Sequence, residues 1–461
     1  MRFFLFIALM WLTLLASAAH AASPKPNILI LLADDLGYAD VGFNGGKVIS
    51  TPNIDHLAAT GINLTDFRVC PMCSPTRAGL LTGRWPGRFG IMRAVIPPWS
   101  TWGLPAEEKT IASLLAPLDY ERRGIIGKWH LGHARQEFLP LAHGFTSFVG
   151  CYNGAIDYFT HERDGECDWH HDALTIHEDG YSTDLIGAES VRFIEQSPAG
   201  KPWFLYVPFN APHEPFQAKE SDLKKYSQFK NLDRRTYAAM VDSMDQAIGK
   251  ILATVEARSD ASNTIVLFAS DNGGVPKAGS SNGAYRGAKL SVYEGGTRVC
   301  AAIRWPAGGL TGGKKFGERI GYIDVLPTLV AVAGGTSPTN LDGVNFLPAL
   351  RGETKLPERA WFSYIHQDDE AHASVHLGQW KLVARGDFFA EKPAVPPALE
   401  LYDLAADPIE ANDLAAKFPE RVADLHQRLR EFGTWQKTGV AAYAEGRDGF
   451  KPPKDWIVLK P

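Results

Sequence analysis

The sequence has no surplus of positive charge, few cysteines and, beyond its first residues, no long apolar run. It carries 47 Lys and Arg against 52 Asp and Glu, for a formal net charge of -5 at pH 7. Nucleic-acid-binding proteins usually carry a basic surplus, so we expect no nucleic-acid partner, although a local cationic pocket remains compatible with this balance. No segment after the N-terminal run is long and apolar enough to cross a bilayer, so we expect no membrane anchor.

The N-terminus holds the most apolar stretch of the chain. Arg2 precedes an apolar run over residues 3–16, and an Ala-x-Ala pattern ends at Ala21. This order is typical of a cleaved secretory signal peptide, which we assign to residues 1–21. A short membrane anchor is the alternative, but the run is short for a bilayer span. We therefore predict an exported protein, periplasmic or secreted.

The five cysteines are an odd number for an exported protein. They are Cys70, Cys73, Cys151, Cys167 and Cys300. In an oxidising compartment at least one thiol must stay unpaired. Cys151 and Cys167 are close enough in sequence for a disulfide, which is a hypothesis only.

The body of the chain alternates short apolar runs with helical patterns, which predicts an α/β fold with a mostly parallel sheet covered by helices on both faces. The expected strands are residues 28–32, 124–127, 203–207 and 264–268. Apolar residues recurring every three or four positions predict a helix over 233–255. A second helix is expected over 184–194, capped by Ser182 or Thr183.

The pattern loosens around residues 341–357, where we place a domain boundary. We expect a catalytic domain over 22–350 and a smaller α+β subdomain over 351–461. Strand-like pieces at 361–364, 380–383 and 399–401 predict a small antiparallel sheet, and residues 419–432 predict a helix packed on it.

Each of the four expected strands runs into a polar cluster. The clusters contain Asp34 and Asp35, Lys128 and His130, His213, and Asp271 and Asn272. Open α/β sheets bind ligands beyond the carboxyl ends of their strands, so these clusters should converge on one site. Each cluster alone is as compatible with a helix cap or a tight turn. Together they pair hard oxygen ligands, suited to Ca²⁺ or Mg²⁺, with cationic groups that include Lys289. That combination indicates an enzyme acting on phosphate or sulfate esters.

The most specific motif is Cys73-Ser74-Pro75-Thr76-Arg77, followed by Thr82-Gly83-Arg84. It resembles the signature of the sulfatase family, Cys-x-Pro-x-Arg followed by Thr-Gly-Arg. The resemblance extends over nearly the whole mature chain and includes the segments 34–37, 127–132, 271–273 and 286–289. It implies an alkaline-phosphatase-like fold and a sulfuric ester hydrolase.

The resemblance also implies a role for each motif residue. A formylglycine-generating or radical maturation enzyme would convert Cys73 to formylglycine. Asp34, Asp35, Asp271 and Asn272, with residue 73, would hold Ca²⁺, or alternatively Mg²⁺. Arg77 would orient the formylglycine diol, and Lys128 and Lys289 would neutralise the sulfate oxygens. His130 would be the base that drives sulfate release, and His213 the acid that protonates the leaving alcohol.

A narrower resemblance concerns the substrate. Residues 157–163, 213–215 and 237–249 resemble the arylsulfatase B branch of the family, which contains N-acetylgalactosamine-4-sulfatases and bacterial polysaccharide sulfatases. This implies a sulfated carbohydrate, with a galactose or N-acetylgalactosamine 4-O-sulfate as the leading substrate. Asp157, His161 and Arg163 are candidates to bind sugar hydroxyls, and a folded loop with internal ion pairs is the alternative.

Two other functions stay open from the sequence. The first is a phosphodiesterase or phosphonate hydrolase on the same fold. The second is a non-catalytic protein that binds sulfated glycans and carries no formylglycine.

Overall fold

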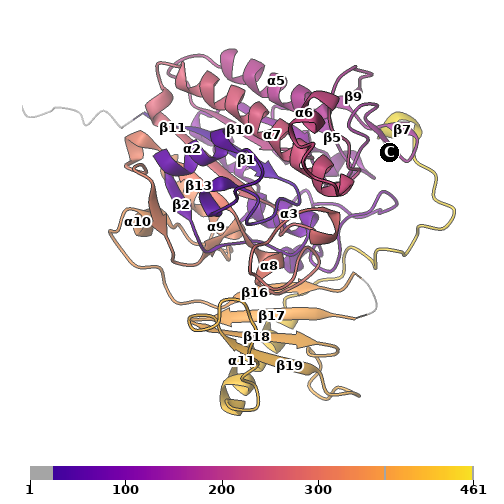
Figure 1. Cartoon of the computed structure of the whole chain (residues 1–461), viewed down its shortest axis with the longest axis vertical. Coiled ribbons are helices and arrows are strands. Elements are labelled where there is room, and N and C mark those ends of the chain that lie inside the picture. Colours follow the sequence, from indigo (N-terminus) through magenta and orange to yellow (C-terminus); the bar gives the residue numbers. More distant parts are fainter. Residues whose placement is uncertain (1–23, 368–369, 459–461) are drawn as a thin grey trace, which may run out of the picture.

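The computed structural model describes residues 24–367 and 370–458 (Figure 1). The expected signal peptide, residues 1–21, lies outside the described residues. A large α/β body occupies the upper part of Figure 1, and a smaller four-stranded sheet lies below it.

The body is built on a ten-stranded sheet in the order β14-β2-β13-β11-β1-β10-β4-β5-β8-β9. Its central strands are β11 (Thr264–Ser270), β1 (Asn27–Ala33), β10 (Trp203–Pro208), β4 (Arg122–Lys128) and β5 (Ser147–Cys151). These five are parallel, which confirms the expected parallel sheet. Antiparallel pairs occur toward both edges, at β13 (Ala301–Arg304) with β2 (Ile62–Leu64) and at β8 (His170–His171) with β9 (Leu174–Thr175). β14 (Lys314–Phe316) pairs parallel with β2.

Alternate residues of β1 point into two separate cores, so helices cover both faces of the sheet. Leu29 and Leu31 pack with α2 (Pro52–Thr60), α5 (Ser182–Glu195) and α7 (Leu232–Glu256). Ile28 and Ile30 pack with α3 (Cys73–Thr82), α4 (Ile111–Leu115) and α9 (Tyr322–Val332). Burial on both faces explains why the strand is a continuous apolar run.

The two expected helices of the body are α5 and α7. The predicted cap of α5 is wrong. The helix already includes Ser182 and Thr183, and the residue before it is Tyr181, which makes no side-chain cap hydrogen bond. Ser182 instead donates its hydroxyl to Asn210 Oδ1 at 3.4 Å, because its side chain is buried against the loop after β10.

Shorter elements connect the sheet to its surroundings. Three two-residue strands, β3 (Phe67–Arg68), β12 (Arg298–Val299) and β15 (Ile320–Gly321), form a small sheet in the order β12-β3-β15. A hairpin of β6 (Glu162–Arg163) and β7 (Glu166–Cys167) stands apart from the main sheet. The remaining helices of the body are α6 (Glu220–Lys225), α8 (Glu294–Thr297) and α10 (Leu347–Leu350).

The C-terminal sheet is antiparallel, as predicted, in the order β16-β17-β18-β19. Its strands are β16 (Trp361–Ile365), β17 (His372–Leu377), β18 (Trp380–Arg385) and β19 (Ala398–Asp403). The predicted helix is α11 (Pro419–Gly433), which packs on β17 and β18. Sequence reasoning missed β17, because its two histidines and its serine alternate with apolar residues and leave no continuous apolar run.

The hypothesis of a Cys151–Cys167 disulfide is wrong. All five cysteines fall within the described residues, and each is a buried, unpaired thiol. The Cys151 thiol instead donates to the Asn153 carbonyl, and the Cys167 thiol to the Ile176 carbonyl.

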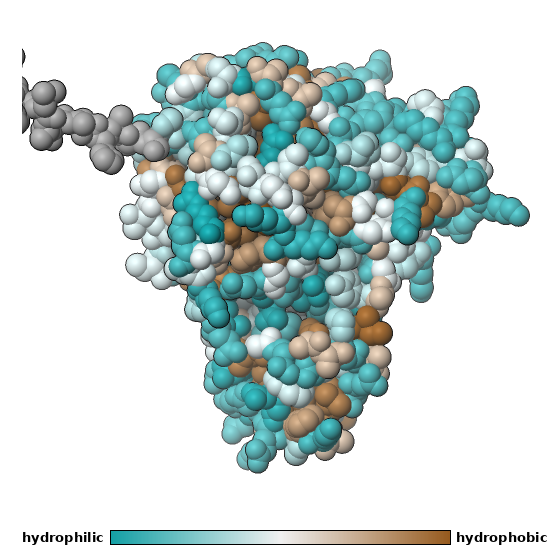
Figure 2. Space-filling model, turned by 60° about the vertical axis from the view of Figure 1, so that its left-hand side comes forward, coloured by the Kyte–Doolittle hydropathy of each residue, from teal (hydrophilic) through white to brown (hydrophobic). Residues whose placement is uncertain are grey.

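The described residues contain no helix that is both long and apolar enough to span a membrane. The face shown in Figure 2 is mostly hydrophilic, and its apolar side chains form small separate patches.

Candidate active site

The structure brings the four polar clusters to one edge of the ten-stranded sheet. Strands β11, β1, β10 and β4 are neighbours and run parallel, so their carboxyl ends lie side by side. Asp34 follows β1, Lys128 ends β4 and Asp271 follows β11. His213 lies in the loop after β10, and Cys73 is the first residue of α3. Open α/β sheets bind ligands at this edge.

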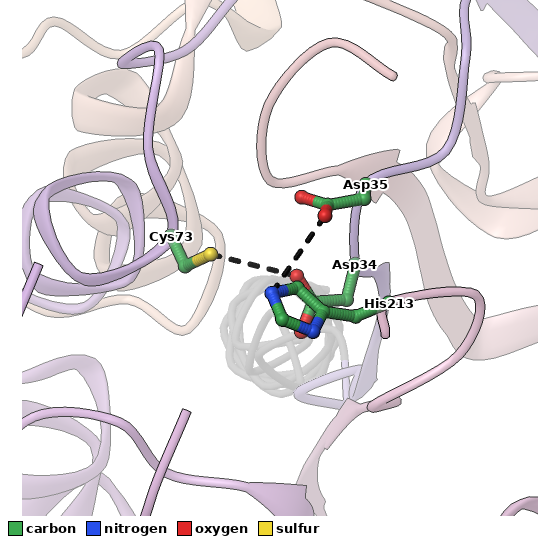
Figure 3. Close-up of side chains that lie close together, drawn as sticks. All are labelled: Asp34, Asp35, Cys73 and His213. Atoms are coloured by element: carbon green, nitrogen blue, oxygen red, sulfur yellow. Dashed lines mark hydrogen bonds and ion pairs between the residues drawn. The ribbon is translucent and has the colours of Figure 1, made fainter. Parts of the chain in front are cut away.

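Four side chains gather at the centre of this edge (Figure 3). Ligand atoms of Asp34, Asp35, Cys73 and His213 all lie within 4.8 Å of one another. Cys73 Sγ lies 3.5 Å from Asp34 Oδ1, and His213 Nε2 lies 3.7 Å from Asp35 Oδ2. Asp35 has a φ of 64°, in the left-handed region that non-glycine residues rarely adopt. Strain of this kind is typical of functional sites.

Asp271 and Asn272 complete an oxygen-rich group. Asn272 Nδ2 donates to Asp35 Oδ1 at 2.7 Å, whereas its Oδ1 is buried with no hydrogen-bond partner among the described residues. Burial and the neighbouring charge of Asp34 raise the pKa of Asp271. A divalent cation would ligate the unpartnered oxygen and reduce the repulsion between the carboxylates. The donor set therefore fits a hard cation.

Two fully buried cations lie against these carboxylates. Arg77 donates to Asp271 Oδ2 from Nε at 3.0 Å and from Nη2 at 2.8 Å, and Lys128 Nζ pairs with Asp34. Arg77 also donates from Nη1 to the Lys128 carbonyl at 3.0 Å. Buried charges are tolerated only when they are paired, so these groups form one mutually dependent network.

Lys289 and two histidines adjoin this network. Lys289 Nζ lies 2.8 Å from Asp35 Oδ2. His130 Nε2 lies 3.0 Å from the Ile96 carbonyl oxygen, and its Nδ1 is buried with no hydrogen-bond partner among the described residues. Burial and nearby positive charges lower the pKa of both His130 and His213. Both shifts favour the neutral form of the imidazole.

A cavity of about 400 Å³ opens onto the cluster. Small-molecule sites typically measure roughly 300–1,000 Å³, so this is a pocket of ligand size. The cluster residues that line it are Asp35, Cys73, His130, His213 and Lys289. The arrangement is therefore a ligand-sized pocket with paired charges buried beneath it.

The chain is similar to known proteins over most of its length. Residues 26–335 match the family model described as Sulfatase. The chain belongs to the sulfatase family. Residues 287–434 of this sulfatase match a second model, described as N-sulphoglucosamine sulphohydrolase, C-terminal. The expected family and α/β fold are confirmed, and the protein is a sulfuric ester hydrolase.

Curated relatives and a solved structure resemble the sulfatase over most of its length. Arylsulfatase A of Bos taurus is 33% identical over 493 residues, covering 96% of this chain and 95% of that protein. N-acetylgalactosamine-6-sulfatase of Homo sapiens is 35% identical over 392 residues, covering 79% of this chain and 72% of that protein. The crystal structure of Ps i-CgsB in complex with k-i-k-neocarrahexaose gives a TM-score of 0.84 at 31% identity, covering 92% of this chain and 96% of that chain.

Of the three residues expected to bind sugar, only Arg163 lines the sulfatase pocket. Asp157 Oδ1 accepts from the backbone amides two and three residues further on, at 2.9 and 2.8 Å. The His161 side chain is buried, stacks on Trp169 with ring centroids 4.8 Å apart, and bonds the Gly180 carbonyl. The structure therefore places Asp157 and His161 in local loop contacts and brings Arg163 alone to the cavity.

Three further residues that line the cavity, Gly154, Gln367 and Tyr443, were missed by sequence reasoning. Gly154 follows β5, which is parallel to β4, so the rule used for the other strand ends could have found it. Tyr443 follows no strand and belongs to no repeating pattern. It is brought to the pocket by contacts with residues far away in the sequence, such as Trp99, and no local pattern predicts such contacts.

Proposed function

We propose that this sulfatase removes sulfate from a sulfated carbohydrate, with a formylglycine formed from Cys73 as its nucleophile. The observation that supports this is the position of Cys73 Sγ, 3.5 Å from Asp34 Oδ1 in a cavity also lined by Lys289. Burial raises the pKa of the Cys73 thiol, so the unmodified side chain would stay protonated and nucleophilically weak. A formylglycine hydrate supplies one hydroxyl to attack sulfur and a second whose ionisation expels the sulfate.

The cations of the site would bind and orient the reacting groups. Arg77 lies four residues after Cys73 on α3, about one helical turn away, and would orient residue 73. Lys128 and Lys289 would neutralise the charge that develops on the sulfate oxygens. Lys289 lines the cavity and can contact the ester directly, whereas Lys128 is fully buried behind Asp34.

The histidines would move the protons. His130, whose buried Nδ1 has no hydrogen-bond partner among the described residues, would take a proton from residue 73 during sulfate release. His213 would protonate the leaving sugar oxygen. Because a bound sulfate ester is anionic, it favours the protonated form of the neighbouring imidazole and prepares His213 for that role.

Asp34, Asp35, Asp271 and Asn272, with residue 73, would hold a divalent cation. The cation supplies Lewis-acid polarisation of the sulfate when it is bound. A mixture of carboxylate and amide oxygens favours Ca²⁺, with Mg²⁺ as the alternative.

For the substrate we propose a galactose or N-acetylgalactosamine sulfate, with the 4-position first. Support comes from the resemblance of residues 157–163 to the arylsulfatase B branch, and from Arg163 at the cavity. The human relative is an N-acetylgalactosamine-6-sulfatase, so the 6-position is the competing outcome. Turnover of matched 4-sulfated and 6-sulfated disaccharides would separate the two, and a preference for the 6-sulfated sugar would overturn the 4-position.

We further propose that the protein is exported to the periplasm or medium after cleavage of residues 1–21. Cys73 is 1% exposed in the fold, so a formylglycine-generating or radical maturation enzyme would have to act before the chain folds. N-terminal sequencing of the exported protein would test the cleavage site, and an N-terminus that begins before residue 22 would contradict it.

The function is tested by expressing the protein with a maturation enzyme and measuring two quantities. The first is the mass of the peptide containing residue 73, which should fall from that of a thiol to that of an aldehyde. The second is kcat/KM for matched aryl sulfate and aryl phosphate esters, which should favour the sulfate. An unmodified Cys73 would remove the proposed nucleophile and leave a glycan-binding protein, whereas preferred phosphate turnover would indicate a phosphodiesterase.

A further inference from the structure

The last part of the chain returns from the C-terminal subdomain to the catalytic body. After α11, residues 437–458, here called the tail, run along the outside of the molecule to a short 3-10 helix, η9 (Lys454–Trp456), beside β7 (Figure 1). At its start, the amides of Lys437 and Val440 donate to the carbonyls of Gly87 and Gly90, at 2.8 and 2.9 Å. The tail therefore has fixed contacts at both of its ends.

Trp456 anchors the C-terminal end of the tail to the body. Its side chain is 1% exposed, and its Nε1 donates to the Arg163 carbonyl at 3.0 Å. The amide of Asp455 donates to Glu166 Oε2 at 2.9 Å, and Thr175 donates its hydroxyl to the Asp455 carbonyl at 2.8 Å. The bonds to Arg163 and Glu166 attach the tail to the β6–β7 hairpin, and the bond to Thr175 attaches it to β9. The hairpin carries Arg163 to the cavity.

The middle of the tail contributes a second wall of the cavity. Tyr443 lines the cavity and packs edge-on against Trp99, with ring centroids 5.3 Å apart. The indole N–H of Trp99 donates to the Tyr443 carbonyl at 3.0 Å. His133 connects the segment before Trp99 to Trp456. It bonds the Pro98 carbonyl at 2.9 Å and packs edge-on against the Trp456 ring.

Resting on the proposed function, we infer that the tail is a substrate-specificity element that holds the sugar next to the scissile sulfate. Tyr443 offers an aromatic ring and a phenolic O–H to the saccharide. Arg163 offers a guanidinium, whose nearest carboxylate in the structure is that of Asp164, at 3.4 Å. Such a group binds hydroxyls or a second anionic substituent of the sugar. Trp456 does not line the cavity and acts as a positioning residue, because it fixes the backbone that carries Arg163.

The test compares a small aryl sulfate with a sulfated disaccharide, in matured protein carrying single substitutions. For Tyr443→Ala and Trp456→Ala, kcat/KM for the disaccharide should fall about ten-fold more than kcat/KM for the aryl sulfate. The loss should appear mainly in KM, because the contacts bind the sugar and not the reacting sulfur. Trp456→Phe keeps an aromatic ring but loses the indole N–H, and should give an intermediate loss. Lys454→Ala, an exposed neighbour in η9, is the matched control and should behave as the wild type.

Equal losses on both substrates would show that the tail only supports the fold and would overturn the inference. An unchanged disaccharide KM in the two alanine variants would also overturn it. If wild-type protein with confirmed formylglycine hydrolyses neither ester, the proposed function itself fails.

A separate experiment identifies the group that Arg163 binds. It measures kcat/KM of the Arg163→Gln variant on monosulfated and disulfated disaccharides. A larger loss on the disulfated sugar indicates an anionic substituent, and equal losses indicate hydroxyls.

Discussion

Position 154 has no room for a side chain. A Cβ atom added there would lie 2.4 Å from Cε1 and Nε2 of His130. The backbone of this loop also fixes His130, because the His130 amide donates to the Tyr152 carbonyl at 3.0 Å. His130 itself has a φ of 55°, in the left-handed region that few non-glycine residues adopt. The loop after β5 therefore fixes the backbone position of His130, the proposed base, and limits where its ring can lie.

Gly154→Ala should displace the His130 ring and lower kcat by about 10²-fold, since small misplacements of a catalytic group carry costs of that order. The fold should survive, because the added methyl group meets a side chain at the cavity rather than the core. Steady-state kinetics and the thermal midpoint would be measured together. Gly317→Ala is the matched control, because its Cβ would lie 3.6 Å from the nearest atom. A kcat unchanged from wild type would contradict the role assigned to His130.

The unpartnered oxygen of Asn272 makes a separate prediction about the metal. Asn272→Leu keeps the size of the side chain but removes this oxygen, together with the Nδ2 that donates to Asp35. We expect the Ca²⁺ concentration that half-restores activity after chelation to rise by about 10–100-fold. Titration of chelated enzyme with Ca²⁺ would measure this shift. The same half-restoring concentration in both proteins would mean that Asn272 is not a ligand.

Among the elements, the central strands could be predicted because burial on both faces leaves a continuous apolar run in the sequence. Such a run at residues 28–32 and 264–268 identified β1 and β11, and the polar residues after them located the site. β17 was missed although its polar and apolar residues alternate as they do in a strand, because the prediction relied on continuous apolar runs. The contact between Trp456 and Arg163 could not be predicted, because the two residues are 293 positions apart in the sequence.

Packing between helices supplies a prediction of its own. Gly187 of α5 faces α7 so closely that a Cβ there would lie 2.9 Å from the Cβ of Ala247. Gly187→Val should force the helices apart and lower the free energy of unfolding by about 1–3 kcal/mol. Ala188→Val, on the exposed face of the same helix, gives the cost of the β-branched side chain alone. Chemical denaturation of both variants would check this, and equal costs would show that the contact is not tight.

For the whole molecule, a buried ion cluster joins the α/β body to the four-stranded C-terminal sheet and the segment that follows it. Lys381 of β18 lies 2.9 Å from Glu294 Oε1 of α8 and 2.8 Å from Glu410 Oε1. Arg68 of β3 also pairs with Glu294, at 2.6 Å. All four side chains are nearly inaccessible to solvent, so each charge depends on its partners.

Removing one member of this cluster should therefore destabilise the contact between the two parts. Lys381→Met keeps the bulk of the side chain but leaves Glu294 and Glu410 with one positive partner fewer, which should cost about 3–5 kcal/mol. Adding Glu410→Gln should recover part of that loss, because the second substitution removes the uncompensated charge. Urea midpoints would measure both effects, and hydrogen exchange in β16 to β19 should rise in the single variant. Lys417→Met, at an exposed position, is the control. If Lys381→Met and this control unfold at the same urea concentration, the cluster does not hold the two parts together, and the apolar contacts between them must do so.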